Sequence, residues 1–334
     1  MCPVIGYYVH HRGSGHRHRA LAIARELDTP VTGLSSALAP VGWTGEWIEL
    51  APDTGPETVH PVDPRAGGRL HWVPRGGTGL LARMAAISAW FVAARPEAVV
   101  VDVSVEVALL ARLHGIPVVT IGQPGDRRDP AHRLGYDISE AIIAPWPAGL
   151  DPLIVDEPNT AKIRPVGTIA RIASTDATSA RRGGVALLRG HGAFGTDPLS
   201  LAADSLRRSG IPVTEITGSV EQISHSLRDA TVVISHCGQN AVAEIAATRT
   251  PALLIADDRP HDEQRHLARA LERFGVPAVV VAEAPSPDRD WAADIERARR
   301  FDGIGWNRFT SGDGAAAAAA IISEVAFAGR EAAI

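Results

Sequence analysis

A histidine, a glycine, two amides and a glutamate follow one short apolar run. After residues 231–235 come His236, Gly238, Gln239 and Asn240, and then Glu244 four residues later. If a helix begins here, its free backbone N–H groups and positive dipole end would bind an anion such as a diphosphate. The Glu244 carboxylate could accept two hydrogen bonds from a vicinal diol such as a ribose. In the alternative interpretation, Asn240 only caps the helix and Glu244 only complements its dipole.

A second candidate site lies near the amino terminus, between a predicted strand and a predicted helix. The sequence GSGHRHR places Gly13 and Gly15 where a backbone can approach a ligand closely. It also places His16 where an imidazole could act as a general base. His18 stands where a dinucleotide fingerprint would need a third glycine, so a nicotinamide enzyme is a poor match. The alternative interpretation of His16 is a helix-capping or surface histidine.

The elements that would position these motifs follow from the hydrophobic pattern. Short apolar runs alternate with stretches of helical periodicity, which is typical of a parallel sheet covered by helices on both faces. The predicted strands are residues 4–10, 47–50, 98–101, 118–121, 141–144, 185–188, 212–216, 231–235, 252–255 and 277–281. The predicted helices are residues 17–27, 80–94, 106–114, 198–209, 222–227, 241–248 and 262–274, with an alanine-rich helix after residue 313.

The alternation stops between residues 146 and 184, where Pro, Asp, Thr, Ser and Arg dominate. We therefore predict a first domain over residues 1–165, which would bind the acceptor of a reaction, and a second domain over residues 166–312. The last segment, 313–334, would form a helix that packs back on the first domain. Ligands would bind in the cleft between the carboxyl ends of the two sheets.

Composition excludes several classes of protein. The chain has 334 residues, 45% of them hydrophobic and 21% charged, which is typical of a folded chain with two cores. A net charge of -5 gives no overall attraction to nucleic acid, so no nucleic-acid partner is expected. Two cysteines are too few for a disulfide framework, and neither a signal peptide nor a membrane span is recognisable. We therefore expect a cytoplasmic location.

The two motifs together resemble those of a known superfamily. HCGxN, the glutamate that follows, Pro251 and the pair Glu263–Gln264 resemble the donor-binding signature of GT-B glycosyltransferases, including the UDP-glycosyltransferases. GSGHxxR resembles the MurG-like branch, the bacterial N-acetylglucosaminyltransferases. The resemblance covers most of the chain and is strongest at residues 4–27 and 230–270. It implies an α/β fold of GT-B type, with two doubly wound Rossmann-like domains that face each other across a cleft.

The resemblance also implies roles for individual residues. His16 would be the catalytic base, and Asp102, at the end of a predicted strand, would orient it; Asp102 could equally be a polar strand terminus. The base of the donor is expected at the backbone of Ser219 and Val220, because the plant enzymes' tryptophan has no counterpart here. The rest of the donor would be bound by Gly13, Gly15, Gly190, His191, Gly192, His236, Gly238, Gln239, Asn240, Glu244, Glu263 and Gln264.

The implied activity is that of a hexosyltransferase that moves a sugar from a nucleotide sugar, expected to be a UDP-sugar, to a hydroxyl acceptor with inversion. Helix dipoles and His236 would offset the charge of the departing diphosphate, so neither a metal nor a cofactor is expected. Two alternatives stay open. One is a nucleotide-sugar hydrolase of the same fold, and the other is a non-catalytic subunit that binds a nucleotide sugar.

The acceptor would be a small molecule or a lipid-linked sugar. Residues 65–83 combine four arginines with Leu70, Trp72, Leu80 and Leu81. This mixture would suit a peripheral contact with the inner face of an anionic membrane. The alternative interpretation is a loop that contacts a soluble acceptor, or a connector without a binding role.

Overall fold

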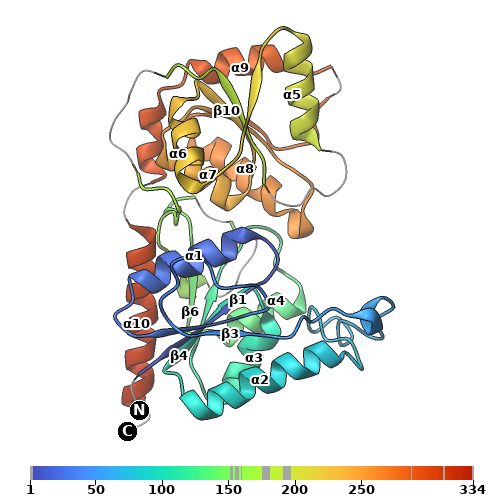
Figure 1. The fold of residues 1–334 in the computed structure, drawn as a ribbon, viewed down its shortest axis with the longest axis vertical. Helices are drawn as coiled ribbons and strands as arrows, with labels where there is room; N and C mark the ends of the chain where they lie inside the picture. Colours follow the sequence, from blue (N-terminus) through green and yellow to red (C-terminus); the bar gives the residue numbers. More distant parts are fainter. Residues whose placement is uncertain are drawn as a thin grey trace.

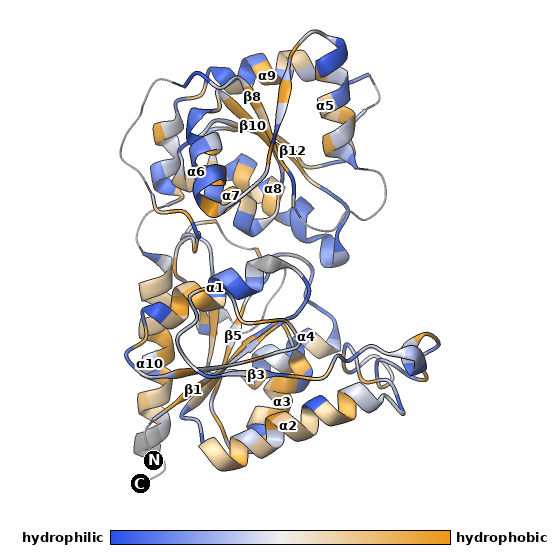
Figure 2. Cartoon of the chain, in the orientation of Figure 1, coloured by the Kyte–Doolittle hydropathy of each residue, from blue (hydrophilic) through white to orange (hydrophobic). Residues whose placement is uncertain are grey.

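Two parallel sheets, one in each half of the chain, organise the computed structural model of the protein (Figure 1). The structure describes residues 3–150, 153–154, 158, 160–174, 181–190, 197–286, 288–310 and 313–332. Strands and helices alternate along the chain, and helices lie on both faces of each sheet. Figure 2 shows the strands as largely hydrophobic, as expected for strands that are covered on both sides. The predicted α/β fold class is confirmed.

The first sheet has the strand order β3-β2-β1-β4-β5-β6-β7. Its strands are β1 (Ile5–Val9), β2 (Val31–Ser35), β3 (Trp47–Glu49), β4 (Ala98–Asp102), β5 (Val118–Ile121), β6 (Ala141–Ala144) and β7 (Ile163–Pro165). Its helices are α1 (Ser14–Arg25), α2 (Thr78–Ala94), α3 (Val105–Leu113) and α4 (Pro130–Asp137), with short 3-10 turns η1 (Pro56–Thr58) and η2 (Thr160–Lys162). Val9 pairs with Asp102, so the carboxyl ends of the two central strands meet at one edge.

The second sheet has the strand order β12-β11-β10-β8-β9. Its strands are β8 (Val185–Leu188), β9 (Val213–Ile216), β10 (Val232–His236), β11 (Ala252–Ile255) and β12 (Ala278–Val281). Its helices are α5 (Pro198–Arg208), α6 (Val220–Asp229), α7 (Gln239–Ala247), α8 (Glu263–Phe274) and α9 (Trp291–Arg299), with 3-10 turns η3 (Pro260–Asp262) and η4 (Gly303–Arg308). The central strand β10 therefore leads directly into α7, as β1 leads into α1.

The last helix, α10 (Gly314–Ala332), returns to the first domain (Figure 1). Its buried residues Ala318, Ile321 and Ile322 belong to the same core as Ile5 and Tyr7 of β1. Short alanine side chains allow a helix to lie close to its neighbours, which explains the alanine-rich sequence of this segment. The chain thus passes from the first domain to the second and back again.

Four strands and helices were not predicted from the sequence: β2, β7, α4 and α9. β2 has the sequence VTGLS, in which a threonine, a glycine and a serine interrupt the apolar pattern, yet all five residues are buried. α4 has only eight residues and α9 only nine, so neither shows more than two turns of periodicity. Tertiary packing, and not local hydrophobicity, determines these short elements.

Between β3 and α2 the chain forms an arm that extends away from the first domain, with η1 near its tip (Figure 1). The arm carries the exposed residues Arg65, Arg69 and Arg75. We also predicted that Arg83 would belong to the membrane-contact surface of residues 65–83, and this prediction was wrong. Its side chain is buried, pairs with Asp53 and donates a hydrogen bond to Ser36 Oγ at 2.7 Å. None of the described helices is both long and apolar enough to cross a membrane.

Candidate functional site

The amino-terminal motif forms the tight turn and the first turn of α1. Gly13 precedes the helix with φ 86°, a conformation that glycine adopts without steric cost. No side chain caps this helix end. Its first backbone N–H groups are therefore available to an anion. His16 lies in the first turn of the helix, at the carboxyl edge of the first sheet.

Asp102, the last residue of β4, contacts His16. His16 Nδ1 lies 2.8 Å from Asp102 Oδ1, and the Asp102 side chain has no exposed surface. An ionised carboxylate can only accept a hydrogen bond, so this contact places a ring proton on Nδ1, and in the neutral ring Nε2 then has a free lone pair. The structure thus brings together the two residues predicted to form the catalytic pair, which lie 86 positions apart in the sequence.

Arg19 is a third member of this group that was not assigned a role from the sequence. It donates hydrogen bonds to both oxygens of Asp102, at 3.0 Å from Nε and 2.7 Å from Nη2, and its side chain is buried. Burial alone would raise the pKa of Asp102, but Arg19 and His16 together hold that pKa below its usual range. Asp102 therefore stays ionised, and Arg19 already compensates much of its charge. The motif GHxxR contained the signal, since residues three apart share one face of a helix.

The second motif surrounds the start of α7. The backbone N–H of Gly238 donates to His236 Nδ1 at 2.9 Å, so a neutral His236 carries its proton on Nε2. Burial, aided by the positive charge of Arg259, lowers the pKa of His236 to about 4, which keeps the ring neutral at pH 7. Among the described residues, neither the buried Nε2 of His236 nor the buried Nε2 of Gln239 has a hydrogen-bond partner. Two unsatisfied donors at an uncapped helix start indicate an anion site.

Gly190 approaches the other side of His236. A β-carbon on Gly190 would lie 2.0 Å from His236 Nε2, so only glycine fits at this position. Gly190 follows the end of β8, which neighbours β10. The predicted donor-site residues His191 and Gly192 lie outside the described residues.

The two motifs meet across the domain boundary. A β-carbon on Gly15 would lie 1.8 Å from Asn240 Nδ2, so the first turn of α1 packs directly against the first turn of α7. Gly238, and not Asn240, occupies the N-cap of α7, and no side chain caps that helix. The interpretation of Asn240 as a simple cap is therefore wrong.

Glu244 is buried on α7 and paired with Arg171. The Arg171 Nε contacts Glu244 Oε1, and Nη2 lies 3.1 Å from Oε2. Burial raises the pKa of Glu244, although Arg171 acts in the opposite direction. A small pocket beside this pair is lined by His18, Arg19 and Asn240 as well. Arg171 precedes the first strand of the second sheet in a segment without periodicity, so no sequence pattern indicated its role.

The two residues expected at the donor sugar lie at the start of α8. Gln264 is buried, accepts from the backbone N–H of Asp257 at 3.0 Å, and places Nε2 3.4 Å from His236 Nδ1. Glu263 lies 3.6 Å from Arg127 Nη2 of the first domain. Gln264 is thus joined to the α7 motif, whereas Glu263 faces the opposite domain.

The residues expected at the nucleotide base begin α6. Ser219 caps this helix, and its backbone N–H already donates to the Gln222 side chain at 2.7 Å. The backbone of Ser219 can therefore bind a base only if that hydrogen bond breaks. Val220 is the first residue of the helix and is only partly buried.

A cavity in the first domain lies directly after Asp102. Its lining includes Val103, Ala108, Ile121 and Gln123, and the lining is mainly apolar. Among the described residues, the buried Gln123 Nε2 has no hydrogen-bond partner. Val103 has φ 65°, which β-branched residues rarely adopt, so this loop is strained where it borders the cavity. The lining residues come from segments far apart in the sequence, namely the arm, α3, β5 and α4, so no local pattern indicates this cavity.

Comparisons with known proteins agree with this arrangement. Residues 180–289 match the glycosyltransferase family 28 C-terminal domain. Among curated proteins, none gives a significant sequence match. Three solved structures align over nearly the whole chain. The kitacinnamycin glycosyltransferase is 16% identical in sequence with a TM-score of 0.67, and the alignment covers 97% of this chain and 99% of that one.

The other two are MurG of Acinetobacter baumannii and a plant enzyme. MurG is 14% identical in sequence with a TM-score of 0.60, and the alignment covers 97% of this chain and 100% of that one. The enzyme UGT2 of Phytolacca americana, solved with UDP-2-fluoroglucose and pterostilbene, is 14% identical with a TM-score of 0.59, and 98% of this chain covers 94% of that one. The chain therefore has the GT-B glycosyltransferase fold. Its fold is similar to those of MurG and the plant enzyme UGT2, and residues 180–289 match the glycosyltransferase family 28 C-terminal domain.

Proposed function

We propose that the protein is a glycosyltransferase that moves a hexose from a UDP-sugar to a hydroxyl acceptor, without a metal and with inversion at the anomeric carbon. The observation that carries the proposal is the contact of Gly15 with Asn240, because it brings the uncapped starts of α1 and α7 together. Two positive helix ends, with the unsatisfied Nε2 donors of His236 and Gln239, suit a diphosphate. The family match of the second domain supports a nucleotide-sugar donor.

In the proposed reaction, His16 is the base. The acceptor oxygen attacks the anomeric carbon while its proton passes to His16 Nε2, whose lone pair is free because Nδ1 donates to Asp102. The bond between the anomeric carbon and the diphosphate oxygen breaks, and its electron pair leaves with the nucleotide. The α7 N-terminus and the neutral His236 Nε2–H stabilise that developing charge. Attack opposite the leaving group inverts the configuration.

Glu244 would bind the ribose of the donor. Its carboxylate is now held by Arg171, which occupies the hydrogen-bonding sites that a vicinal diol would use. Arg171 would therefore compete with the ribose hydroxyls for the Glu244 carboxylate. A deoxyribose lacks the 2′-hydroxyl and would leave part of the carboxylate unsatisfied, which favours UDP over dTDP.

The cavity beside Val103, about 30 Å³ in volume, would have to widen to receive the acceptor. It begins at the residue after Asp102, so a hydroxyl at its mouth would lie near the proposed base. Its apolar lining favours a small molecule with an apolar body, and Gln123 Nε2 offers one donor for a polar group.

The arm provides a second proposal, a peripheral contact with an anionic membrane that would give access to a lipid-linked acceptor. Arg65, Arg69 and Arg75 are exposed on the arm, and Leu81 at the start of α2 is 72% exposed. Cosedimentation with vesicles that contain anionic lipid tests this contact. The wild type should bind more than an Arg69→Ala/Arg75→Ala variant, and equal binding would contradict it.

Mass spectrometry can test the function as a whole. The protein is incubated with a panel of nucleotide sugars, each with and without a panel of hydroxylated apolar acceptors. The proposal predicts consumption of a UDP-sugar only when an acceptor is present, with a product heavier than the acceptor by one hexosyl group. Consumption without any acceptor would indicate the hydrolase, and binding without consumption would indicate a non-catalytic subunit.

A further inference from the structure

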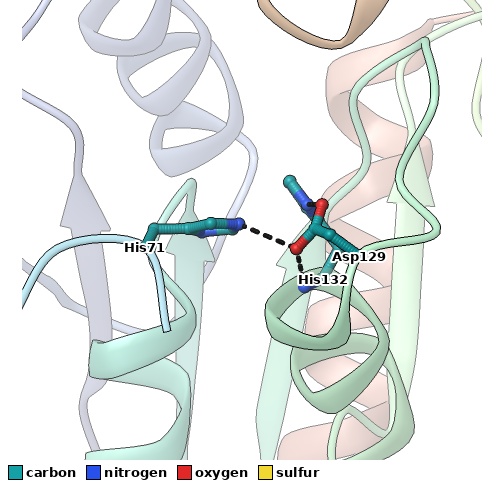
Figure 3. Close-up of side chains that lie close together, drawn as sticks. All are labelled: His71, Asp129 and His132. Atoms are coloured by element: carbon teal, nitrogen blue, oxygen red, sulfur yellow. Dashed lines mark hydrogen bonds and ion pairs between the residues drawn. The ribbon is translucent and has the colours of Figure 1, made fainter. Parts of the chain in front are cut away.

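Two histidines and an aspartate converge between the arm and α4, away from the proposed diphosphate site. Figure 3 shows His71, on the arm, pointing toward Asp129 and His132 at the start of α4. His71 Nε2 lies 3.3 Å from Asp129 Oδ1, and His132 Nδ1 lies 2.5 Å from Asp129 Oδ2. One ligand-type atom from each residue lies within 4.8 Å of the other two.

Helix capping explains only part of this cluster. Asp129 is the N-cap of α4, and its Oδ1 accepts from the backbone N–H groups of Ala131 and His132 at 3.1 Å each. A cap needs no partner on the arm, yet His71 reaches the same carboxylate from 58 residues away in the sequence. The three side chains are 25%, 23% and 12% exposed for His71, Asp129 and His132, so the cluster is sheltered but open to solvent.

We propose that His71, Asp129 and His132 form a binding site for a divalent transition-metal ion of the Zn²⁺ class. Imidazole nitrogens favour Zn²⁺ and its neighbours over Mg²⁺ or Ca²⁺, and two histidines with one carboxylate leave coordination positions open for water or another ligand. Coordination through His132 Nδ1 moves the ring proton, which Nδ1 now shares with Asp129, to Nε2, and Arg127 Nη1 must then turn away from that nitrogen. The ion would replace two hydrogen bonds by three coordinate bonds and would fix the arm to α4.

Two neighbours modify this site. Arg127 Nη1 lies 3.2 Å from His132 Nε2, and its positive charge opposes a cation, although Glu263 offsets part of it at 3.6 Å. We therefore expect weaker binding than at a structural zinc site. His261 of the second domain places Nδ1 3.9 Å from Asp129 Oδ2, and its ring lies 4.8 Å from that of His132. An ion held by the first domain would thus lie beside a further imidazole of the second.

The position of the site separates it from the transfer chemistry. His71 and His132 both line the apolar cavity that follows Asp102, whereas the unsatisfied donors of the diphosphate site lie at α7. A bound ion would therefore border the acceptor cavity and not the leaving group. The inference stands without the proposed function, because it rests on the donor atoms alone.

Calorimetric titration of Zn²⁺ into the EDTA-treated and dialysed protein tests the site. The wild type should bind one equivalent at this site. Co²⁺ should give visible absorption bands that Zn²⁺ abolishes, and Mg²⁺ should give no heat. His71→Ala and Asp129→Asn should each weaken Zn²⁺ binding by at least about ten-fold.

Neither His71→Ala nor Asp129→Asn should unfold the protein, so a loss of Zn²⁺ binding would reflect the loss of a ligand. His71 lies on the arm, and asparagine caps helices as well as aspartate, so α4 should persist in Asp129→Asn. His225→Ala, on the exposed face of α6, is the matched control and should bind like the wild type. Absence of Zn²⁺ binding to the wild type, or equal affinity in all variants, would overturn the proposal. So would loss of binding in His11→Ala alone, which would place the ion near Asp53 instead.

Discussion

Gly15 and Asn240 touch across the boundary between the two domains, with room for no side chain on Gly15. Through this contact the first turns of α1 and α7 form one site from motifs 225 positions apart. Substituting Gly15 therefore tests the arrangement of the whole site.

Gly15→Ala should lower the free energy of unfolding by about 1–3 kcal/mol, because the added methyl overpacks against Asn240. Chemical denaturation measures this loss. In an Asn240→Ala background the same substitution should cost less, because the contacting amide is gone. Gly77→Ala is the control, since a β-carbon there meets no atom closer than 3.4 Å. Equal losses at Gly15 with and without Asn240 would contradict the contact.

Glu244→Ala should weaken UDP binding and reduce the preference for UDP over dTDP. The substitution removes the hydrogen bond between the Glu244 carboxylate and the 2′-hydroxyl, which corresponds to roughly 1–3 kcal/mol of binding free energy. Arg171→Met should instead tighten UDP binding, since Glu244 would no longer be held by a guanidinium. Calorimetry with both nucleotides checks the two variants. Equal affinity of the wild type for UDP and dTDP would count against the ribose assignment.

Transfer should persist in the presence of EDTA, because in the proposed reaction helix ends and His236 stabilise the leaving group in place of a metal. Product formation is followed with and without the chelator. Loss of activity that Mg²⁺ or Mn²⁺ restores would be inconsistent with this mechanism.

His236→Ala should lower donor affinity while the circular dichroism spectrum stays unchanged.

The protein should become less stable as the pH falls from about 6.5 to about 4. Burial, with the positive charge of neighbouring groups, lowers the pKa of His10 and of His236 to about 4 in the folded state, below the value of 6.5 for a free histidine. In this window the unfolded chain binds more protons, so acidification favours unfolding by roughly 1–2 kcal/mol per histidine at pH 5. Urea denaturation at pH 5 and pH 7 checks the difference. A higher stability at pH 5 would contradict it.

Asp102→Asn should affect both stability and turnover. The substitution leaves the buried guanidinium of Arg19 without its carboxylate, and breaking a buried pair in this way costs about 3–5 kcal/mol. It also disturbs the tautomer of His16. Because these effects combine, the thermal melting temperature is measured beside turnover. An unchanged melting temperature would show that Arg19 does not depend on Asp102.

A feature of the site could be predicted from the sequence only where its residues lie close together along the chain. The α7 motif could be predicted because His236, Gly238, Gln239 and Asn240 are consecutive or nearly so and follow a strand. The contact of His16 with Asp102 depends on β1 and β4 being neighbours, which no local pattern reveals; only the resemblance to GT-B enzymes suggested it. Short elements such as α4 carry too few turns to show periodicity.

Side-chain partners from irregular segments could not be predicted at all. Arg171 lies in the irregular segment before β8, where no hydrophobic pattern predicts which way a side chain points. Its pairing with Glu244 is visible only in the folded chain. The same holds for His71 and Asp129, which three-dimensional folding brings together from the arm and the α4 cap. Chemistry within one motif can thus be inferred from sequence, whereas chemistry between loops requires the structure.

In the proposed reaction His16 activates an acceptor hydroxyl against a donor bound at α7, and the rate of UDP release reports on this step. At saturating donor and acceptor, the wild type should release UDP only when the acceptor is present. His16→Ala should reduce that rate by about 10² to 10⁴-fold while calorimetry shows nearly unchanged donor affinity. Release of UDP by His16→Ala at the wild-type rate would contradict the account.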